Sequence, residues 1–198
     1  MKSIEIPTNS SPMDKVLVYL LSGKAGVGKS FSGDFIRLAY STKGYKTINL
    51  PYAEGVKAVA TSMGWNGKKD SAGRALLQSI GNAGRQYDNN TWVNMAINKY
   101  FNHPQYPIDV VTMDDWRYSN EYEQVNNNPL FKVIAIRIES PHRELLKDNE
   151  TLYNDISEIS LDKFDRFSYV IDNPIENPDA VLTALSNIIV TETLKNRR

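Results

Sequence analysis

Apolar residues along the chain fall into short runs that alternate with longer stretches of helical spacing. The runs at 16–21, 45–50, 108–113, 131–138 and 167–171 are short and bounded by polar or turn residues, so they predict five strands. Between these runs, apolar positions recur every three or four residues, as in amphipathic helices. Strands that alternate with helices predict an α/β fold: a three-layer sandwich with a mostly parallel five-stranded sheet.

The longest helical region lies between the second and third predicted strands. It runs from about Glu54 to Phe101 and is interrupted by a polar turn at 65–70, so at least three helices are expected there. The last helix is predicted to begin with Asn177 as its cap and Pro178 at its first position.

The first predicted strand ends in a glycine-rich loop. Residues 23–30 read GKAGVGKS and match GxxxxGK[ST] in full, between a strand and a helix. Glycines allow backbone N–H groups to surround a polyphosphate, Lys29 is expected to reach the β- and γ-phosphates, and the Ser30 hydroxyl suits Mg²⁺. The residues predicted to bind the phosphates of a nucleotide are Gly23, Lys24, Ala25, Gly26, Val27, Gly28, Lys29 and Ser30.

The amino-acid composition limits the kinds of molecule that the chain is expected to bind. Lys plus Arg and Asp plus Glu are both 23, which gives no basic field for nucleic acid and favours a small molecule. There is no cysteine, and two isolated histidines do not form a zinc site. Because no apolar run is long enough to cross a bilayer, we expect a cytoplasmic protein without a membrane partner.

The length of 198 residues suits one domain. Residues 1–13 carry two prolines and a Ser/Asn cluster, so we expect a flexible arm followed by a single domain at 14–198, with inserted helices at about 52–102. The polar stretch at about 139–160 has weak periodicity and is predicted to be a lid.

A phosphate loop predicts nucleotide binding and leaves the reaction open. A GTPase needs NKxD after a strand, which this chain lacks, and its DxxG at Asp70–Gly73 follows a turn. Small kinases, in contrast, insert helices after the second strand to hold the acceptor and place a flap after the fourth. The predicted order of elements matches that layout.

Three segments resemble the bacteriophage deoxynucleoside monophosphate kinases. The segment at 52–97 resembles the acceptor-binding region of that family, and VVTMDDWRYSNEYE and SEISLDKFDRFSYVIDN are similar to two further family segments. Glu54, Asn82 and Ala83 depart from the pattern. The matching positions in the first segment are Ala53, Lys57, Gly64, Trp65, Lys69, Asp70, Arg74, Leu77, Gln78, Gly81, Gly84, Arg85, Trp92 and Val93.

The resemblance implies transfer of the γ-phosphoryl group of ATP to a deoxynucleoside 5′-monophosphate (dNMP), giving ADP and the diphosphate. The acceptor phosphate is already anionic, so the site needs cations more than a general base. Asp114 and Asp115 follow the third strand, where ligands bind in such sheets, and either is expected to serve Mg²⁺ with Ser30.

The remaining roles follow from residue type and the same resemblance. Lys29, Arg85, Arg117 and Asp114 are expected to be catalytic. The residues expected at the acceptor are Lys57, Arg74, Arg85, Tyr87, Trp116 and Arg117. Arg143, near the lid, is expected at the donor.

Two other functions stay open at this point. One is a small kinase for a phosphorylated metabolite that is not a nucleotide. The other is a regulatory module that binds a nucleotide without catalysis. Which bases are accepted, and whether the chain forms a homodimer, also remain open.

Overall fold

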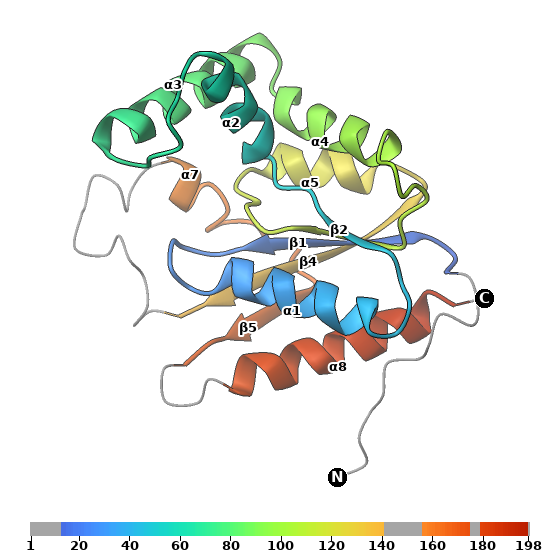
Figure 1. Cartoon of the computed structure of the whole chain (residues 1–198). Helices are drawn as coiled ribbons and strands as arrows, with labels where there is room; N and C mark the ends of the chain where they lie inside the picture. The colour runs from blue at the N-terminus through green and yellow to red at the C-terminus, as the bar shows by residue number, and fades with distance from the viewer. Residues whose placement is uncertain (1–12, 141–155, 175–178, 198) are drawn as a thin grey trace.

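The computed structural model describes residues 13–140, 156–174 and 179–197. At its centre lies a five-stranded sheet, all parallel, in the order β2-β3-β1-β4-β5 (Figure 1). The strands are β1 (Val16–Ser22), β2 (Thr47–Asn49), β3 (Val110–Met113), β4 (Phe131–Glu139) and β5 (Tyr169–Asp172). Each strand overlaps its predicted run, and the predicted α/β fold with a five-stranded sheet is confirmed.

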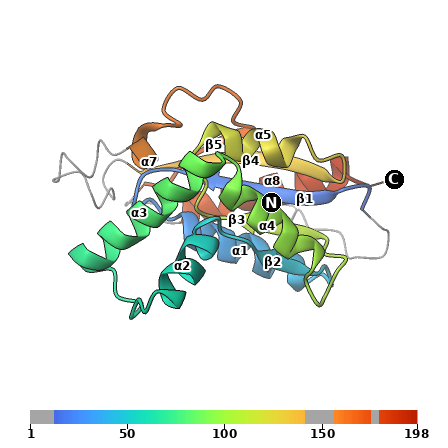
Figure 2. The same ribbon diagram turned by 90° about the horizontal axis from the view of Figure 1, so that it is seen from above.

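Helices cover both faces of the sheet (Figures 1 and 2). The three helices predicted between β2 and β3 are present, whereas α5 was not predicted. The first predicted residues of the last helix lie outside the described residues. The described helices are α1 (Lys29–Ser41), α2 (Ala53–Ser62), α3 (Ser71–Tyr87), α4 (Thr91–Phe101), α5 (Ser119–Asn126), α7 (Ile156–Ile159) and α8 (Asp179–Lys195).

Strand β1 shows why its sequence is a continuous apolar run. Val18 and Leu20 belong to the core cluster shared with α4 and α5, whereas Leu17, Tyr19 and Leu21 belong to the cluster shared with α1 and α8. Side chains of a strand alternate between faces, so a strand buried on both sides must be apolar at every position.

The order of the strands determines where a ligand can lie. All five strands end at one edge of the sheet, and the chain passes over β1 when it runs from β3 to β4. Ligands of open parallel sheets bind in the crevice at the carboxyl ends of the strands, where the winding reverses. Helices α2 and α3 stand above this edge (Figure 1).

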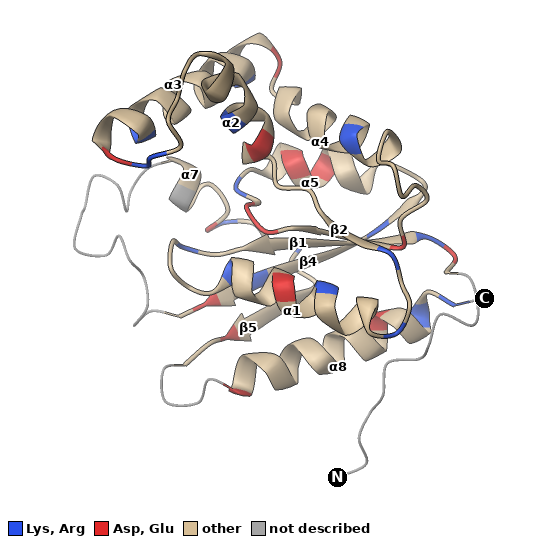
Figure 3. Cartoon of the chain, in the orientation of Figure 1, with Lys and Arg blue, Asp and Glu red and all other residues tan. Residues whose placement is uncertain are grey.

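Acidic and basic residues are interspersed over the helices and loops rather than separated onto different elements (Figure 3). Within the described ranges, no helix is both long enough and apolar enough to cross a membrane.

Candidate active site

The loop between β1 and α1 is pressed against the neighbouring strands. Gly23, Gly26 and Gly28 have positive φ angles of 148°, 88° and 104°. A Cβ atom on Gly23 would lie 2.3 Å from the carbonyl oxygen of Ile138, and one on Gly28 would lie 2.9 Å from Asn173 Nδ2. The glycines of the motif are therefore required both by backbone conformation and by space.

The loop opens into α1 in a form that suits an anion. Gly28 caps the helix in the left-handed conformation, without a side-chain hydrogen bond and without an acidic residue in the first turn. The positive end of the helix and its first N–H groups are therefore not matched by a carboxylate of α1. Lys29 Nζ donates to the carbonyl oxygens of Gly23 and Lys24, both at 2.8 Å, so its ammonium group lies over the loop.

Asn173 follows β5 and holds the loop from the other side. Its buried Nδ2 atom donates to the carbonyl oxygen of Val27 at 2.9 Å, and its backbone oxygen accepts from Ser140 Oγ at 2.5 Å. Although Asn173 ends one of the family-like segments, the sequence alone gave it no role, because this contact joins residues 146 positions apart.

Lys24 does not point toward the phosphate side of the loop. Its side chain is 10% exposed and pairs with Asp162 Oδ2 at 3.0 Å, and Asp162 also accepts from Arg137 Nη2 at 2.9 Å. Lys24 thus links the loop to the chain that follows α7.

The two acids after β3 have different surroundings. Both carboxylate oxygens of Asp115 accept backbone N–H groups at the start of α2, from Tyr52 at 2.9 Å and Ala53 at 2.8 Å. Burial raises the pKa of Asp115, while these two hydrogen bonds oppose the rise. Asp115 therefore caps the start of α2, and its role as a metal ligand stays a prediction.

Asp114 faces the loop instead. Its Cβ atom lies 3.4 Å from the Cβ position of Gly33 in the second turn of α1, and its Oδ1 accepts from Asn49 Nδ2 at 3.1 Å. Asp114 and the exposed Ser30 hydroxyl line the same cavity and offer the oxygen ligands that Mg²⁺ prefers. Among the described residues, no group of three or more His, Cys, Asp or Glu side chains is placed so that it could hold a metal ion.

A cavity of about 600 Å³ extends from the loop to α2, α3 and α5. It brings together residues predicted for the donor, the metal and the acceptor from separate parts of the chain. The predicted residues in its wall are Ala25, Gly26, Lys29, Ser30, Lys57, Arg85, Asp114, Asp115 and Arg117.

Arg85 owes its position to the contact between α3 and α4. Trp92 Nε1 donates to the carbonyl oxygen of Gly81 at 3.0 Å, and a Cβ atom on Gly84 would lie 2.4 Å from the Trp92 ring. The Arg85 guanidinium carbon then lies 4.7 Å from the centre of the Tyr118 ring, in cation–π contact. The close approach of α3 to Trp92 thus helps to place Arg85 in the cavity wall.

Arg117 joins the cavity to α7. Its Nη1 donates to the carbonyl oxygen of Ser157 at 3.2 Å, and the Ser160 hydroxyl donates to its backbone oxygen. Most of the predicted lid lies outside the described residues, but its last residues contact the site here.

Three predicted acceptor residues do not line the cavity. Trp116 is fully buried among Tyr122, Phe164 and Phe167, so the prediction that it contacts the acceptor is wrong. Tyr87 is 91% exposed at the end of α3 and lies outside the cavity wall.

Arg74 is also exposed and lies outside the cavity wall, and its Nε donates to the carbonyl oxygen of Lys69 at 3.0 Å. Tyr87 and Arg74 face solvent because α3 directs only one side toward the cavity. Arg143, predicted at the donor, lies outside the described residues.

Glu121 is a cavity residue to which the sequence assigned no role. It is 6% exposed, and its Oε2 accepts the backbone N–H groups of Arg117 at 2.9 Å and Tyr118 at 3.0 Å. Burial raises the pKa of Glu121 to about 8, against the lowering effect of these bonds. A glutamate three residues after a helix start is the available sequence signal, and it predicts a cap rather than a cavity residue.

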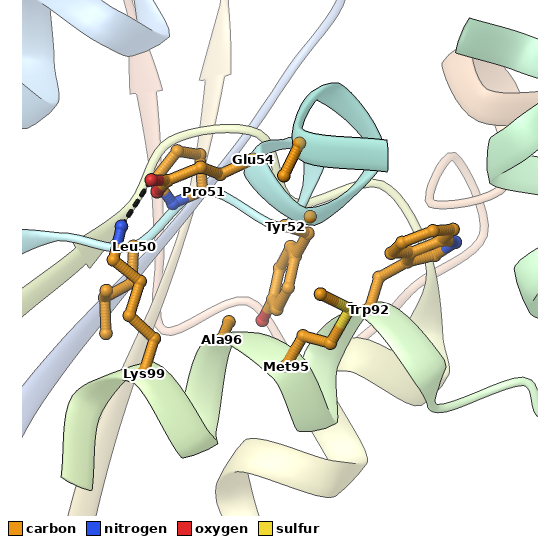
Figure 4. A pocket seen from close by; sticks show the side chains of 10 residues that line it. Leu50, Pro51, Tyr52, Glu54, Trp92, Met95, Ala96 and Lys99 are labelled. Carbon is orange, nitrogen blue, oxygen red and sulfur yellow. Dashed lines mark hydrogen bonds and ion pairs between the residues drawn. The ribbon is translucent and has the colours of Figure 1, made fainter. Parts of the chain in front are cut away.

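A second, smaller cavity of about 180 Å³ lies between α2 and α4 (Figure 4). Pro51, Tyr52 and Trp92 line both cavities, and an ion pair between Glu54 and Lys99 spans the rim of the smaller one. The wall between α2 and α4 is therefore thin and largely apolar.

Comparison with known proteins supports the fold. No protein-family model matches the chain, and no curated protein matches it. A candidate kinase from Chloroflexus aurantiacus J-10-FL is similar in structure, with a TM-score of 0.53 and 10% sequence identity over 93% of this chain and 98% of that chain. The protein APE1195 gives a TM-score of 0.46 at 14% identity over 94% and 98%, and nothing is inferred from it. At such identities the likeness concerns the fold alone.

Proposed function

We propose that this chain is a kinase that transfers the γ-phosphoryl group of ATP to the phosphate of a dNMP, giving ADP and the deoxynucleoside diphosphate. The observation that carries the proposal is the shared cavity. Lys29 and Ser30 of the phosphate loop line one part of it, and the cations Lys57, Arg85 and Arg117 line another. The choice of a dNMP rests on the sequence resemblance, and the structural likeness to a candidate kinase agrees with phosphoryl transfer.

The proposed reaction requires the cavity to align two phosphate groups and to neutralise their negative charge. The oxygen of a monophosphate is already anionic near neutral pH, so it needs no strong base in order to attack. Two anionic groups must instead be held in line, and fixed cations and N–H groups supply that in a site with little water. One cavity contains a helix start and five cations, which meet this requirement: Lys29, Lys57, Lys69, Arg85 and Arg117.

Each side chain has a distinct role in the proposal. Lys29 leaves the carbonyl oxygens of Gly23 and Lys24 and binds the donor phosphates. Ser30 and Asp114 hold Mg²⁺, which neutralises charge on the transferred group when it is bound. Arg85 offers the acceptor phosphate a planar fork of donors, and Lys57 adds a second positive charge.

An assay of ADP release tests the proposal. With ATP and Mg²⁺, we expect at least one of the common dNMPs to stimulate ADP release, because the acceptor completes the site. The Lys29→Ala variant should lose about a hundredfold or more of this rate, because it lacks the cation at the phosphate loop.

Lys43→Ala is the matched control, since Lys43 lies beyond the opposite end of α1. If neither dNMPs nor ribonucleotides raise ADP release above the Lys29→Ala rate, the kinase proposal is wrong. ATP binding without such stimulation would instead support a regulatory module.

A further inference from the structure

Glu121 is a buried carboxyl group in the cavity wall that the proposed reaction does not use. It lies on α5 and is 6% exposed. Among the described residues, its Oε2 atom has two hydrogen-bond partners and its Oε1 atom has none. Glu121 is one of the residues that line the cavity, so this second oxygen is the one available to a ligand there.

The surroundings of Glu121 fit a phosphate binding site. Arg117 donates its backbone N–H to the carboxyl group, and Arg85, on α3, is close enough to act on it electrostatically. Asp115 and Tyr52 are the other titratable groups that face it. An ionised carboxylate here would repel a phosphate held by the two arginines, whereas a carboxylic acid would bind it.

We propose that Glu121 is a neutral hydrogen-bond donor to the acceptor phosphate, with its proton on Oε1. This inference rests on the proposed function and adds a residue that determines acceptor affinity. Oε2 already accepts two N–H groups, so it corresponds to the carbonyl oxygen of the neutral carboxylic acid. The proton is therefore on Oε1. The cavity therefore binds phosphate with a protonated acid beside two cations.

The pKa of Glu121 has the direction that this role needs. Burial raises the pKa to about 8, and the charge of Asp115 acts in the same sense. The N–H groups of Arg117 and Tyr118 and the charge of Arg85 act against the rise. With a pKa of about 8, the acid is mostly neutral at pH 7, where it can donate, and mostly ionised at pH 9, where it would repel the acceptor.

Glu121→Gln is the decisive variant. Its carbonyl oxygen can accept the same two N–H groups and its NH₂ group can donate from the place of Oε1, so it copies the neutral acid but does not titrate. For the wild type, we expect the acceptor KM to rise about tenfold between pH 7 and pH 9, with kcat nearly constant. For Glu121→Gln, the KM should change by less than about twofold over this range.

Glu123→Gln on the same helix is the matched control, because Glu123 is on the outside and pairs with Arg166. It should keep the wild-type pH profile. Equal profiles for the wild type and Glu121→Gln would overturn the inference, as would an acceptor that binds wild type more tightly at pH 9 than at pH 7.

Calorimetric titration with dTMP separates this inference from the proposed function. Suppose that the wild type loses affinity for dTMP above pH 8, that Glu121→Gln does not, and that no acceptor is turned over. This result supports the Glu121 inference and overturns the kinase activity. A protein that turns over dNMPs with equal pH profiles in both forms overturns the Glu121 inference alone. Thermal unfolding of each variant at pH 7 shows whether it is folded.

Discussion

Asp114 and Asp115 are adjacent acids that have different surroundings in the fold. Both follow β3, and their sequence context gives no reason to choose between them. The choice depends on residues about 60 positions earlier, because Tyr52 and Ala53 donate both of their N–H groups to Asp115. Asp114 is left to face the phosphate loop.

Exchanging each acid for its amide separates the two roles. Asp114→Asn should lower Mg²⁺-dependent ADP release by about a hundredfold and leave the thermal unfolding temperature nearly unchanged, because Asn still accepts from Asn49. Asp115→Asn should cost about 1–2 kcal/mol of stability, because one amide NH₂ group then faces a backbone N–H. Thermal unfolding and the ADP-release assay measure these effects. A loss of Mg²⁺ dependence in Asp115→Asn with none in Asp114→Asn would contradict this assignment.

The phosphate loop could be predicted from one contiguous motif, and the other cations of the cavity wall from a family resemblance. Lys29 and Ser30 follow from eight consecutive residues, whereas Trp116 shows the limit of residue type. An aromatic ring suits base stacking and a core equally well, and here three other rings surround it. Glu121 and Asn173 act through tertiary contacts and could not be assigned from their neighbours in the chain.

At the scale of elements, α3 shows how packing controls the site. The apolar spacing of α3 predicted the helix, and Gly81 and Gly84 matched the family pattern. Neither observation predicted which residues these two glycines contact. Trp92 of α4 fills the space beside Gly84 and donates to the carbonyl oxygen of Gly81, while the Arg85 side chain lies beside Gly81 and reaches Tyr118. Helix α5 was missed because most of its eight residues are polar, with Val125 and Glu121 as the buried ones.

Gly84→Ala tests this packing. The added Cβ atom cannot fit beside the Trp92 ring, so α3 must shift, and we expect a loss of about 1–3 kcal/mol in stability together with a higher acceptor KM. Ser79→Ala is the control, because Ser79 is exposed on the same helix and should change neither property. Denaturant unfolding and acceptor titration measure the two effects. Wild-type stability in Gly84→Ala would show that Trp92 does not set the position of α3.

At the scale of the whole molecule, strand order creates the site. The alternation of apolar runs with helical spacing was enough to predict a mostly parallel five-stranded sheet. The signal is strongest in the central strands β1 and β3, which are buried at almost every position. The order β2-β3-β1-β4-β5 places the ends of β1 and β3 side by side, so the loop and Asp114 meet at one edge. The inserted helices then close the cavity above that edge and bring Lys57 and Arg85 into it.

The central claim is that one cavity holds a donor triphosphate and an acceptor phosphate for direct transfer. It is tested most directly with ATP labelled in its γ-phosphoryl group, incubated with Mg²⁺ and each dNMP, followed by separation of the products. We predict that the label appears in the deoxynucleoside diphosphate in an amount equal to the ADP formed, and that Lys29→Ala lowers the rate of this transfer about a hundredfold or more. Label found only in inorganic phosphate, or ADP formed at the same rate without an acceptor, would contradict the claim.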